Sequence, residues 1–221
     1  LSITYVSAHV NWTLWDKLCY TLQKEPDFRA DDEAVLQANR FAAGIVLTSL
    51  GAVFFQAGEE AARTKEGIGD SYRSPADLNA LDWERMYQYK DLMEYYKGML
   101  LIRRSFSGYR MRSREAVKAI HFYKYSKKCV AFSFDALSDG DPWQRLWIVY
   151  SAKKRDCTLR LPAAKRVLLS DGRRVYVSGS KAGSAPQGDE PEVQPVLGDE
   201  ETVPVRACGV SVFGECRESL Q

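Results

Sequence analysis

The chain has 221 residues, 45% of them hydrophobic, and its 31 basic and 29 acidic side chains give a formal net charge of +2. This apolar content is enough for a packed core in one large domain or two ordinary ones. The charges are spread along the chain without a polybasic tract or acidic tail, which argues against nucleic acid or a membrane surface as a partner. No run of about 18 apolar residues offers a membrane span. The start of the chain also lacks the basic-then-apolar order of a signal peptide.

Cysteine and histidine usage limits the possible metal and thiol chemistry. The 5 cysteines contain no Cys-x-x-Cys pair, and the 2 histidines are His9 and His121, so no metal site of familiar spacing is present. Scattered cysteines in odd number favour buried apolar residues or plain thiols over a disulfide framework. We therefore expect no metal and no catalytic cysteine, and we favour a cytoplasmic location slightly over a secreted one.

The first third of the chain has the pattern of a βαβ unit. Ile3–Ser7 is a short apolar run typical of a buried parallel strand, and a polar loop follows it. Asp31–Glu33 supplies a cap and an acidic first turn for a helix that we expect to stop before Gly51. Ala52–Gln56 then predicts a second short strand.

A long polar loop and a long helix are expected next. Arg63–Asp82 contains glycines and a proline, and loops of this length are usually functional or mobile. Apolar and aromatic residues at three-and-four spacing predict a helix over Glu84–Arg104, with Gly108 marking the break. The stripe of that helix, which we expect to face a core, comprises Tyr89, Leu92, Met93, Tyr96 and Leu100.

From about residue 112 the pattern changes to short strands separated by turn residues, as in a β-sandwich or barrel. Asp171–Gly172 is a strong hairpin signal, and Ser178–Glu201 has the composition of an exposed loop. The expected strands are Val117–Tyr125, Cys129–Phe134, Leu146–Tyr150, Cys157–Leu161, Lys165–Leu169, Arg173–Val177, Thr202–Arg206 and Gly209–Phe213. The fold class is thus α/β followed by all-β, with domains at residues 1–111 and 112–221.

One motif carries the most functional information. Residues 5–18 read Tyr-Val-Ser-Ala-His-Val-Asn-Trp-Thr-Leu-Trp-Asp-Lys-Leu, an apolar strand that runs into polar and aromatic groups suited to a sugar. The segment resembles the seventh-strand motif of the pullulanase branch of the α-amylase superfamily. In that motif an aspartate stabilises the transition state, and this sequence has Val10 at its position.

Three further segments resemble the same family in the same order. Residues 51–65 are similar to its eighth-strand motif, residues 70–83 to the Asn-Ser-Tyr-Lys-Ser-Pro stretch and its sequel, and residues 95–104 to the last barrel helix. Together they cover about the first half of the chain, and their joint occurrence is specific. The second half resembles the family's C-terminal sandwich domain in being rich in β-strand patterns.

The resemblance implies a retaining hydrolase of α-1,6 branches in pullulan, glycogen or starch, built on a (β/α)8 barrel followed by a β-sandwich. It assigns strands seven and eight to this chain, and the nucleophile and general acid to strands four and five, outside it. Such chemistry needs no metal or organic cofactor. The implied ligand is an α-glucan. Because two barrel strands leave open edges, the chain alone is predicted to be inactive, with a missing N-terminal part of the barrel or self-association covering those edges.

Three residues are candidate substrate contacts by this resemblance. His9 would hydrogen-bond hydroxyls of the sugar at the cleavage point, since neutral imidazole offers one donor and one acceptor. Asn11 is a second sugar contact or a loop cap, and Tyr72 lines the cleft or is an ordinary half-buried tyrosine. Glu59 and Glu60 are adjacent, so we expect them to anchor a loop and not to form an acid/base pair.

Val10 leaves a rival interpretation open. An engineered substitution, a catalytically silent relative and a shifted loop would each explain it. The alternative function is therefore a non-catalytic glycan-binding or structural homologue.

Overall fold

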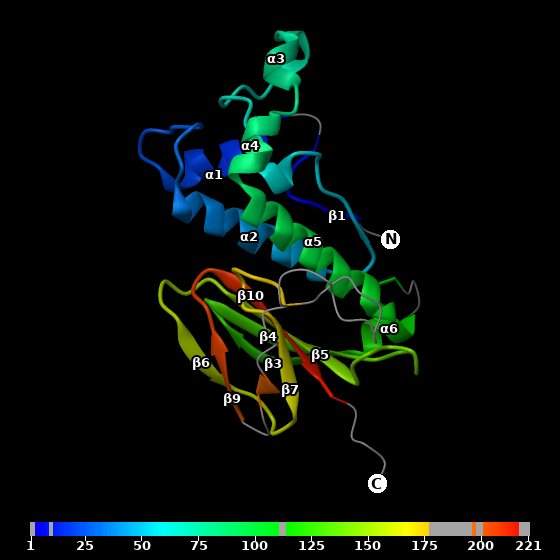
Figure 1. Ribbon diagram of the computed structural model, residues 1–221. Coiled ribbons are helices and arrows are strands. Elements are labelled where there is room, and N and C mark those ends of the chain that lie inside the picture. The colour runs from blue at the N-terminus through cyan, green and yellow to red at the C-terminus, as the bar shows by residue number, and fades with distance from the viewer. Residues whose placement is uncertain (1–2, 9–10, 111–113, 177–195, 198–200, 217–221) are drawn as a thin grey trace, which may run out of the picture. The chain divides into compact units, whose positions relative to one another are not determined.

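The computed structural model describes residues 3–8, 11–110, 114–176, 196–197 and 201–216 (Figure 1). The chain forms two compact units, Leu1–Tyr96 and Lys97–Gln221, which are described separately below. The division between these units falls within helix α5, Lys90–Ser105. The domain boundary expected after residue 111 stays a prediction.

The first unit is a small parallel pair of strands with helices. Strands β1 and β2 pair in parallel, with Ile3 opposite Ala52 and Thr4 opposite Val53, and helix α2 lies between them in sequence. The expected βαβ unit is confirmed. The elements of this unit before α5 are β1 (Ile3–Thr4), α1 (Leu14–Leu22), α2 (Glu33–Thr48), β2 (Ala52–Val53), η1 (Glu59–Ala61), η2 (Ser71–Arg73), α3 (Ala76–Asn79) and α4 (Trp83–Gln88).

Several local expectations in this unit were wrong. Strands β1 and β2 are shorter than predicted, and Ile3 is 62% exposed, because each strand has a hydrogen-bonded neighbour on one side only among the described residues. Helix α1 occupies part of the expected polar loop. It begins because the Thr13 hydroxyl accepts the backbone N–H of Asp16 at 3.1 Å and caps the helix. The later polar loop contains η2 and α3.

The long helix expected over residues 84–104 is interrupted. Tyr89 has φ −101° and ψ 36°, outside helical values, so α4 ends there and α5 begins at Lys90. Tyr89, Leu92 and Tyr96 are buried as expected. Leu100 is exposed, and Met99 and Ile102 are buried in its place, because the buried side of α5 continues from Tyr96 by a step of three residues and not four.

The second unit is a β-sandwich. Six strands form one sheet in the order β3-β4-β5-β10-β7-β8, and β6 pairs with β9 in a second sheet. Side chains of both sheets share one core, in which Leu159 and Val203 pack with Trp147, Val149 and Phe213. The described strands are β3 (Ile120–Ser126), β4 (Cys129–Asp135), β5 (Arg145–Ser151), β6 (Cys157–Arg160), β7 (Arg166–Ser170), β8 (Val196–Leu197), β9 (Thr202–Val205) and β10 (Gly209–Glu215).

Short helices and turns complete this unit. η3 (Ser107–Arg110) and α6 (Arg114–Lys118) precede β3, so Val117 belongs to a helix and not to the expected strand. Asp171–Gly172 forms a turn, as predicted, because the Asp171 carboxylate accepts two backbone N–H groups at 2.8 Å and Gly172 has φ +91°. The strand expected over Arg173–Val177 is absent from its described part, where Val175 makes a single bridge to Ser170.

Some expectations lie partly beyond the described ranges. Most of the loop expected over Ser178–Glu201 falls outside them, and the short strand β8 lies within its described part. The β-rich second half is confirmed. Within the described residues, the part expected to belong to a (β/α)8 barrel contributes one parallel pair of strands, β1 and β2. No helix within the described ranges is long and apolar enough to cross a bilayer.

Candidate functional site

The candidate site lies where strands β1 and β2 end. Because the strands are parallel, their carboxyl ends share one edge, and the segments that follow them meet there. Tyr5 and Phe54 continue the two strands and pack edge to face, with ring centroids 6.3 Å apart. His9 and Val10 lie outside the described residues. The structure therefore describes the site around them.

Asn11 and Trp12 begin the described part of the first segment. Asn11 has φ +68°, a left-handed conformation that asparagine tolerates better than most residues, and its side chain is exposed. The partly exposed indole of Trp12 packs against Tyr20, with ring centroids 4.7 Å apart. The turn at Asn11 leads into the Thr13 cap of α1.

A buried carboxylate makes the first connection between the two segments. The Ser7 hydroxyl, after β1, donates to the Glu59 carboxylate, after β2. The backbone N–H of Gln56 donates to the same carboxylate at 3.0 Å. Asn39 of α2 donates to the backbone carbonyl of Glu59 at 3.2 Å, and the Tyr96 hydroxyl donates to Asn39 at 2.8 Å. Glu59 thus links both strand ends to the helix layer.

Glu60 has a separate anchoring role. Its carboxylate accepts the backbone N–H of Gly58 at 2.9 Å. Gly58 has φ +96°, and a Cβ there would lie 2.7 Å from Cδ of Arg63, so this turn requires glycine. The expected loop-anchoring role of Glu59 and Glu60 is confirmed. Both carboxylates are committed to internal contacts and do not face each other across an open cleft.

Burial gives Glu59 a testable pH dependence. Desolvation raises the pKa of its carboxyl above the ordinary 4.5, and the Ser7 and Gln56 hydrogen bonds offset only part of that rise. A pKa raised on folding gives stability that is complete below the unfolded value and is lost as pH rises through the folded value. We expect Glu59→Gln to flatten this fall, measured as the change in free energy of unfolding between pH 4 and pH 7. An unchanged pH slope in the variant would contradict the assignment.

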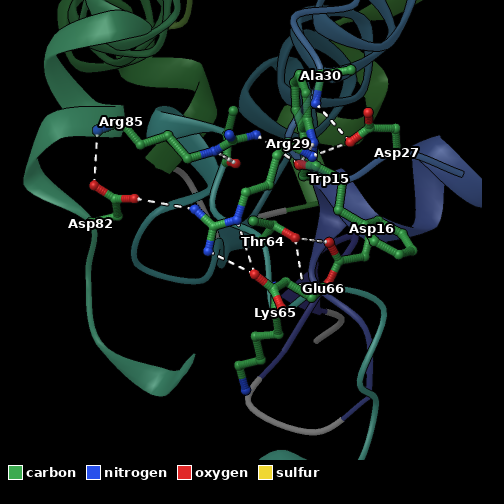
Figure 2. A network of polar contacts seen from close by, with 12 residues as sticks. Trp15, Asp16, Asp27, Arg29, Ala30, Thr64, Lys65, Glu66, Asp82 and Arg85 are labelled. Carbon is green, nitrogen blue, oxygen red and sulfur yellow. Dashed lines mark hydrogen bonds and ion pairs between the residues drawn. The ribbon is translucent and has the colours of Figure 1, made fainter. Parts of the chain in front are cut away.

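Asp16 makes the second connection and is fully buried (Figure 2). Its carboxylate accepts the Thr64 hydroxyl at 2.5 Å and the backbone N–H of Lys65 at 2.9 Å. The neighbouring Lys17 ammonium donates to the Val6 carbonyl at 2.8 Å, which holds α1 against the end of β1. Helix α1 is thereby fixed to both segments.

A third group of contacts holds the loop that carries Tyr72. The buried Lys65 ammonium donates to the Ser71 hydroxyl at 2.7 Å, and Ser71 donates to the Asn79 side chain at 2.8 Å. The Asn79 amide returns a hydrogen bond to the Ser71 carbonyl at 2.8 Å. Burial, followed by the nearby Arg63 charge, lowers the pKa of Lys65. These contacts fix the η2 turn at its first residue, Ser71.

Two glycines let the loop that carries Tyr72 approach residues 11–28 closely. A Cβ at Gly67 would lie 2.6 Å from the Phe28 ring and from the Tyr20 hydroxyl. A Cβ at Gly69 would lie 3.4 Å from the indole nitrogen of Trp12 and 3.7 Å from Cα of Asn11. The structure thus brings the Asn11 segment against the loop that carries Tyr72.

Tyr72 presents its ring to solvent. The side chain is 72% exposed, more than expected for a half-buried tyrosine. The Arg73 guanidinium carbon lies 5.1 Å from the ring centroid, so a cation supports one face of the ring. Such a ring, on a turn fixed by buried hydrogen bonds, is accessible to a ligand.

Trp15 and Arg85 belong to the network of polar contacts that Figure 2 shows. Trp15 is buried, and its indole N–H donates to the Phe28 carbonyl at 3.0 Å. The buried Arg85 guanidinium lies 5.0 Å from the Trp15 ring and donates to the Ala62 carbonyl at 2.6 Å. The exposed Arg29–Glu66 pair, at 2.7 Å, adds little to stability because water screens it.

Thiol chemistry has no support at this site. Cys19 is fully buried on α1, and burial, with the Asp16 charge as a second cause, raises the pKa of its thiol to about 11. A thiol with that pKa is almost entirely protonated near neutral pH and is a poor nucleophile. All 5 cysteines are free, and the described residues contain no cluster of 3 or more side chains suited to a metal ion.

The sequence interpretation missed most of the residues that build the site. The motif segments contain four of these residues, and the sequence interpretation assigned none of them a role in the site. They are Ser7, Asp16, Thr64 and Lys65. The available signal was that their hydrogen-bonding groups lie in the segments that follow the two strands. The structure indicates that these motif positions hold the two segments together.

Comparisons with known proteins show similarity to pullulanases. A family model described as the pullulanase all-beta domain matches residues 117–173. The pullulanase of Bacillus subtilis is 30% identical over 162 residues, which cover 73% of this chain and 22% of that protein. These similarities are consistent with a pullulanase-type C-terminal portion of an alpha-amylase family enzyme.

Solved structures extend the similarity to almost the full length of this chain. The type I pullulanase of Bacillus subtilis complexed with maltose has a TM-score of 0.82 and 25% identity, covering 98% of this chain and 28% of that one. The Paenibacillus barengoltzii pullulanase complexed with maltohexaose and alpha-cyclodextrin has a TM-score of 0.77 and 31% identity, covering 98% and 30%. The chain thus spans about a quarter of the length of these relatives.

Proposed function

We propose that this chain is a C-terminal segment of a pullulanase-like glycoside hydrolase that cleaves α-1,6-glucosidic branches of pullulan, glycogen or starch with retention. The main supporting observation is the pair of motif segments connected by Glu59 and Asp16 at the common end of β1 and β2. Barrel enzymes carry their chemistry at that end of their strands. The similarity to pullulanases supports the same proposal.

The proposed architecture divides the work between two domains. Residues 1–111 would supply strands seven and eight of a (β/α)8 barrel, and residues 112–221 the sandwich domain. The exposed Ile3 supports this proposal, because an apolar residue on a strand with one neighbour needs another strand or a second chain to cover it. The missing N-terminal part of the barrel, or self-association, would provide that cover.

The proposed substrate contacts are His9, Asn11 and Tyr72. His9 would donate and accept hydrogen bonds with glucose hydroxyls. Asn11, exposed in its left-handed turn, would present its amide to a neighbouring hydroxyl. The exposed Tyr72 ring would lie against the apolar face of a pyranose.

Retaining cleavage requires a nucleophile and a proton donor about 5 Å apart. Glu59 and Glu60 are committed to internal hydrogen bonds, so neither is a candidate for these roles. We place both catalytic carboxylates outside this chain, and no metal or organic cofactor takes part.

Val10 stands where the family has a carboxylate. The attraction between that carboxylate and the sugar grows as positive charge develops on the sugar. Loss of such a group removes several kcal/mol of stabilisation that exists mainly in the transition state. This departure was the reason for the rival non-catalytic function, which the similarity to pullulanases does not favour.

The first test is activity of the chain itself. We expect the purified 221-residue chain to release no reducing sugar from pullulan above the level of a mock purification, because it lacks both catalytic carboxylates. The measurement is a reducing-end assay with a commercial pullulanase as positive control. Hydrolysis that follows the chain through size-exclusion chromatography would contradict the placement of the carboxylates.

The second test is the coding region upstream of Leu1. An upstream segment with the acidic motifs of the fourth and fifth strands, expressed together with this chain, is expected to give pullulan hydrolysis that His9→Ala lowers. Val10→Asp in that protein is expected to raise the rate. An upstream region without those motifs would favour the non-catalytic alternative.

A further inference from the structure

A hollow on the sandwich has a different set of polar and aromatic residues from the strand-end site. Its volume is about 320 Å³, at the small end of the range of about 300–1,000 Å³ for small-molecule sites. Strands β3, β4 and β5 line it. All lining residues belong to the second unit, so this hollow is distinct from the site around Asn11 and Tyr72.

A polar group of three side chains lies on one side of the hollow. The Asp135 carboxylate contacts Nε2 of His121 at 2.9 Å and accepts Nε of Arg145 at 2.5 Å. A carboxylate has about four acceptor positions and a guanidinium has five N–H donors, so these contacts use only part of their capacity. The three side chains together offer donors and acceptors within a few ångströms of each other, as adjacent sugar hydroxyls require.

The charges in the hollow compensate each other. Asp135 pairs with Arg145, and the same guanidinium lies 3.8 Å from the Glu215 carboxylate. Glu215 in turn accepts the Trp147 indole N–H at 2.6 Å and lies 3.9 Å from the buried Arg166 guanidinium, so two guanidinium groups balance the two carboxylates. A balanced set of this kind lacks the excess positive charge that a phosphate needs and the excess negative charge that a cation needs. An uncharged, hydroxyl-rich ligand fits it best.

Aromatic rings lie beside the polar group. Tyr123 is 49% exposed and packs edge to face on Trp147, with ring centroids 5.6 Å apart. The register of β3 against β4 shifts between Phe122 and Lys124, a bulge that leaves Tyr123 without a directly paired residue. Bulges on edge strands commonly redirect a side chain, and β3 is an edge strand of the sheet. Tyr123 therefore presents a supported ring next to Asp135, His121 and Arg145.

We propose that this hollow is a second carbohydrate-binding site, which holds one or two glucose units of an α-glucan away from the strand-end site. The ring of Tyr123 contacts the apolar face of a pyranose, and Asp135, His121 and Arg145 bind its hydroxyls. The identity of the ligand as an α-glucan rests on the proposed function. The chemistry of the hollow supports a neutral saccharide independently of it.

The test is a calorimetric titration of the full 221-residue chain with maltohexaose, and amide NMR shifts locate the binding. We expect shifts at residues 120–126 and 133–135, and a Tyr123→Ala variant should lose about tenfold in affinity there. Tyr123→Phe, which keeps the ring, should stay within about twofold. Tyr87→Ala removes a tyrosine that is 85% exposed and lies outside both sites, and it should change nothing. Cellohexaose, a β-glucan of equal length, should bind more weakly.

The outcomes separate this proposal from the proposed function. A Tyr72→Ala variant that loses shifts at residues 70–73 but keeps those of β3 supports two sites. Shifts at β3 without any at residues 70–73 support the hollow and count against the strand-end contacts. Shifts at residues 70–73 alone, or affinity unchanged by Tyr123→Ala, would overturn the second site. Equal binding of cellohexaose at β3 would overturn its assignment to an α-glucan.

Discussion

Replacing Asp16 with alanine is expected to lower the free energy of unfolding by about 2–4 kcal/mol. The carboxylate is fully buried and accepts from the Thr64 hydroxyl and from the backbone N–H of Lys65. Its removal leaves the buried Lys65 N–H and the part-buried Thr64 hydroxyl without their acceptor, which costs more than the hydrogen bonds themselves contribute. Urea denaturation measures the effect, and amide exchange over residues 64–73 should accelerate because this loop loses its connection to α1.

The matched control is Asp91→Ala. Asp91 is an exposed aspartate in the first turn of α5, where its charge favours the helix only slightly. We expect a loss within about 1 kcal/mol there. A double-mutant cycle with Thr64→Val should give a coupling energy of about 0.5–3 kcal/mol with Asp16. Additive effects, or equal losses for Asp16→Ala and Asp91→Ala, would show that the buried contacts do not hold the loop.

Replacing Phe134 with alanine is expected to cost about 3–5 kcal/mol of unfolding free energy, measured by urea or thermal denaturation. The ring is buried and contacts Phe106 and Tyr109 edge to face, with centroids 5.4 and 5.6 Å away. Gly108 lies directly against it, since a Cβ there would be 2.4 Å from Cζ of Phe134. Truncating the ring leaves a cavity among side chains that cannot collapse freely.

Two further variants test this packing. Phe122→Ala removes an equal ring that is 75% exposed and should cost less than about 1 kcal/mol. Gly108→Ala alone should cost about 1–3 kcal/mol by overpacking, and it should cost less in a Phe134→Ala background, where its methyl group has space. A loss for Phe122→Ala as large as for Phe134→Ala would contradict the description of this cluster.

The sequence predicted the order of elements better than their extent. The sequence predicted the helix cap at Asp32 and the turn at Asp171–Gly172, because each depends on the residue types at those positions. The break at Tyr89 and the short strands β1 and β2 were not found. A helix break and the length of a strand depend on contacts with residues far away in the sequence. The periodicity of apolar residues carries no information about those contacts.

The same distinction applies to the candidate site. The motif in residues 5–18 indicated sugar chemistry and predicted His9 and Asn11 as sugar contacts, and the resemblance of residues 70–83 added Tyr72. It did not indicate that Ser7 binds Glu59, or that Asp16 binds the Thr64–Lys65 segment. These pairs are 48 to 52 residues apart in the chain, so only the parallel pairing of β1 and β2 brings them together.

By itself, the sequence determined the type of each half, the pullulanase resemblance and the absence of local metal-binding spacing, because composition, periodicity and motifs are local properties. The tertiary structure alone decided which carboxylates are committed to internal contacts and which rings face solvent. It also alone revealed the sandwich hollow, whose Asp135, His121 and Arg145 come from three strands. Burial and hydrogen-bond partners arise from contacts between distant segments, so no local pattern encodes them.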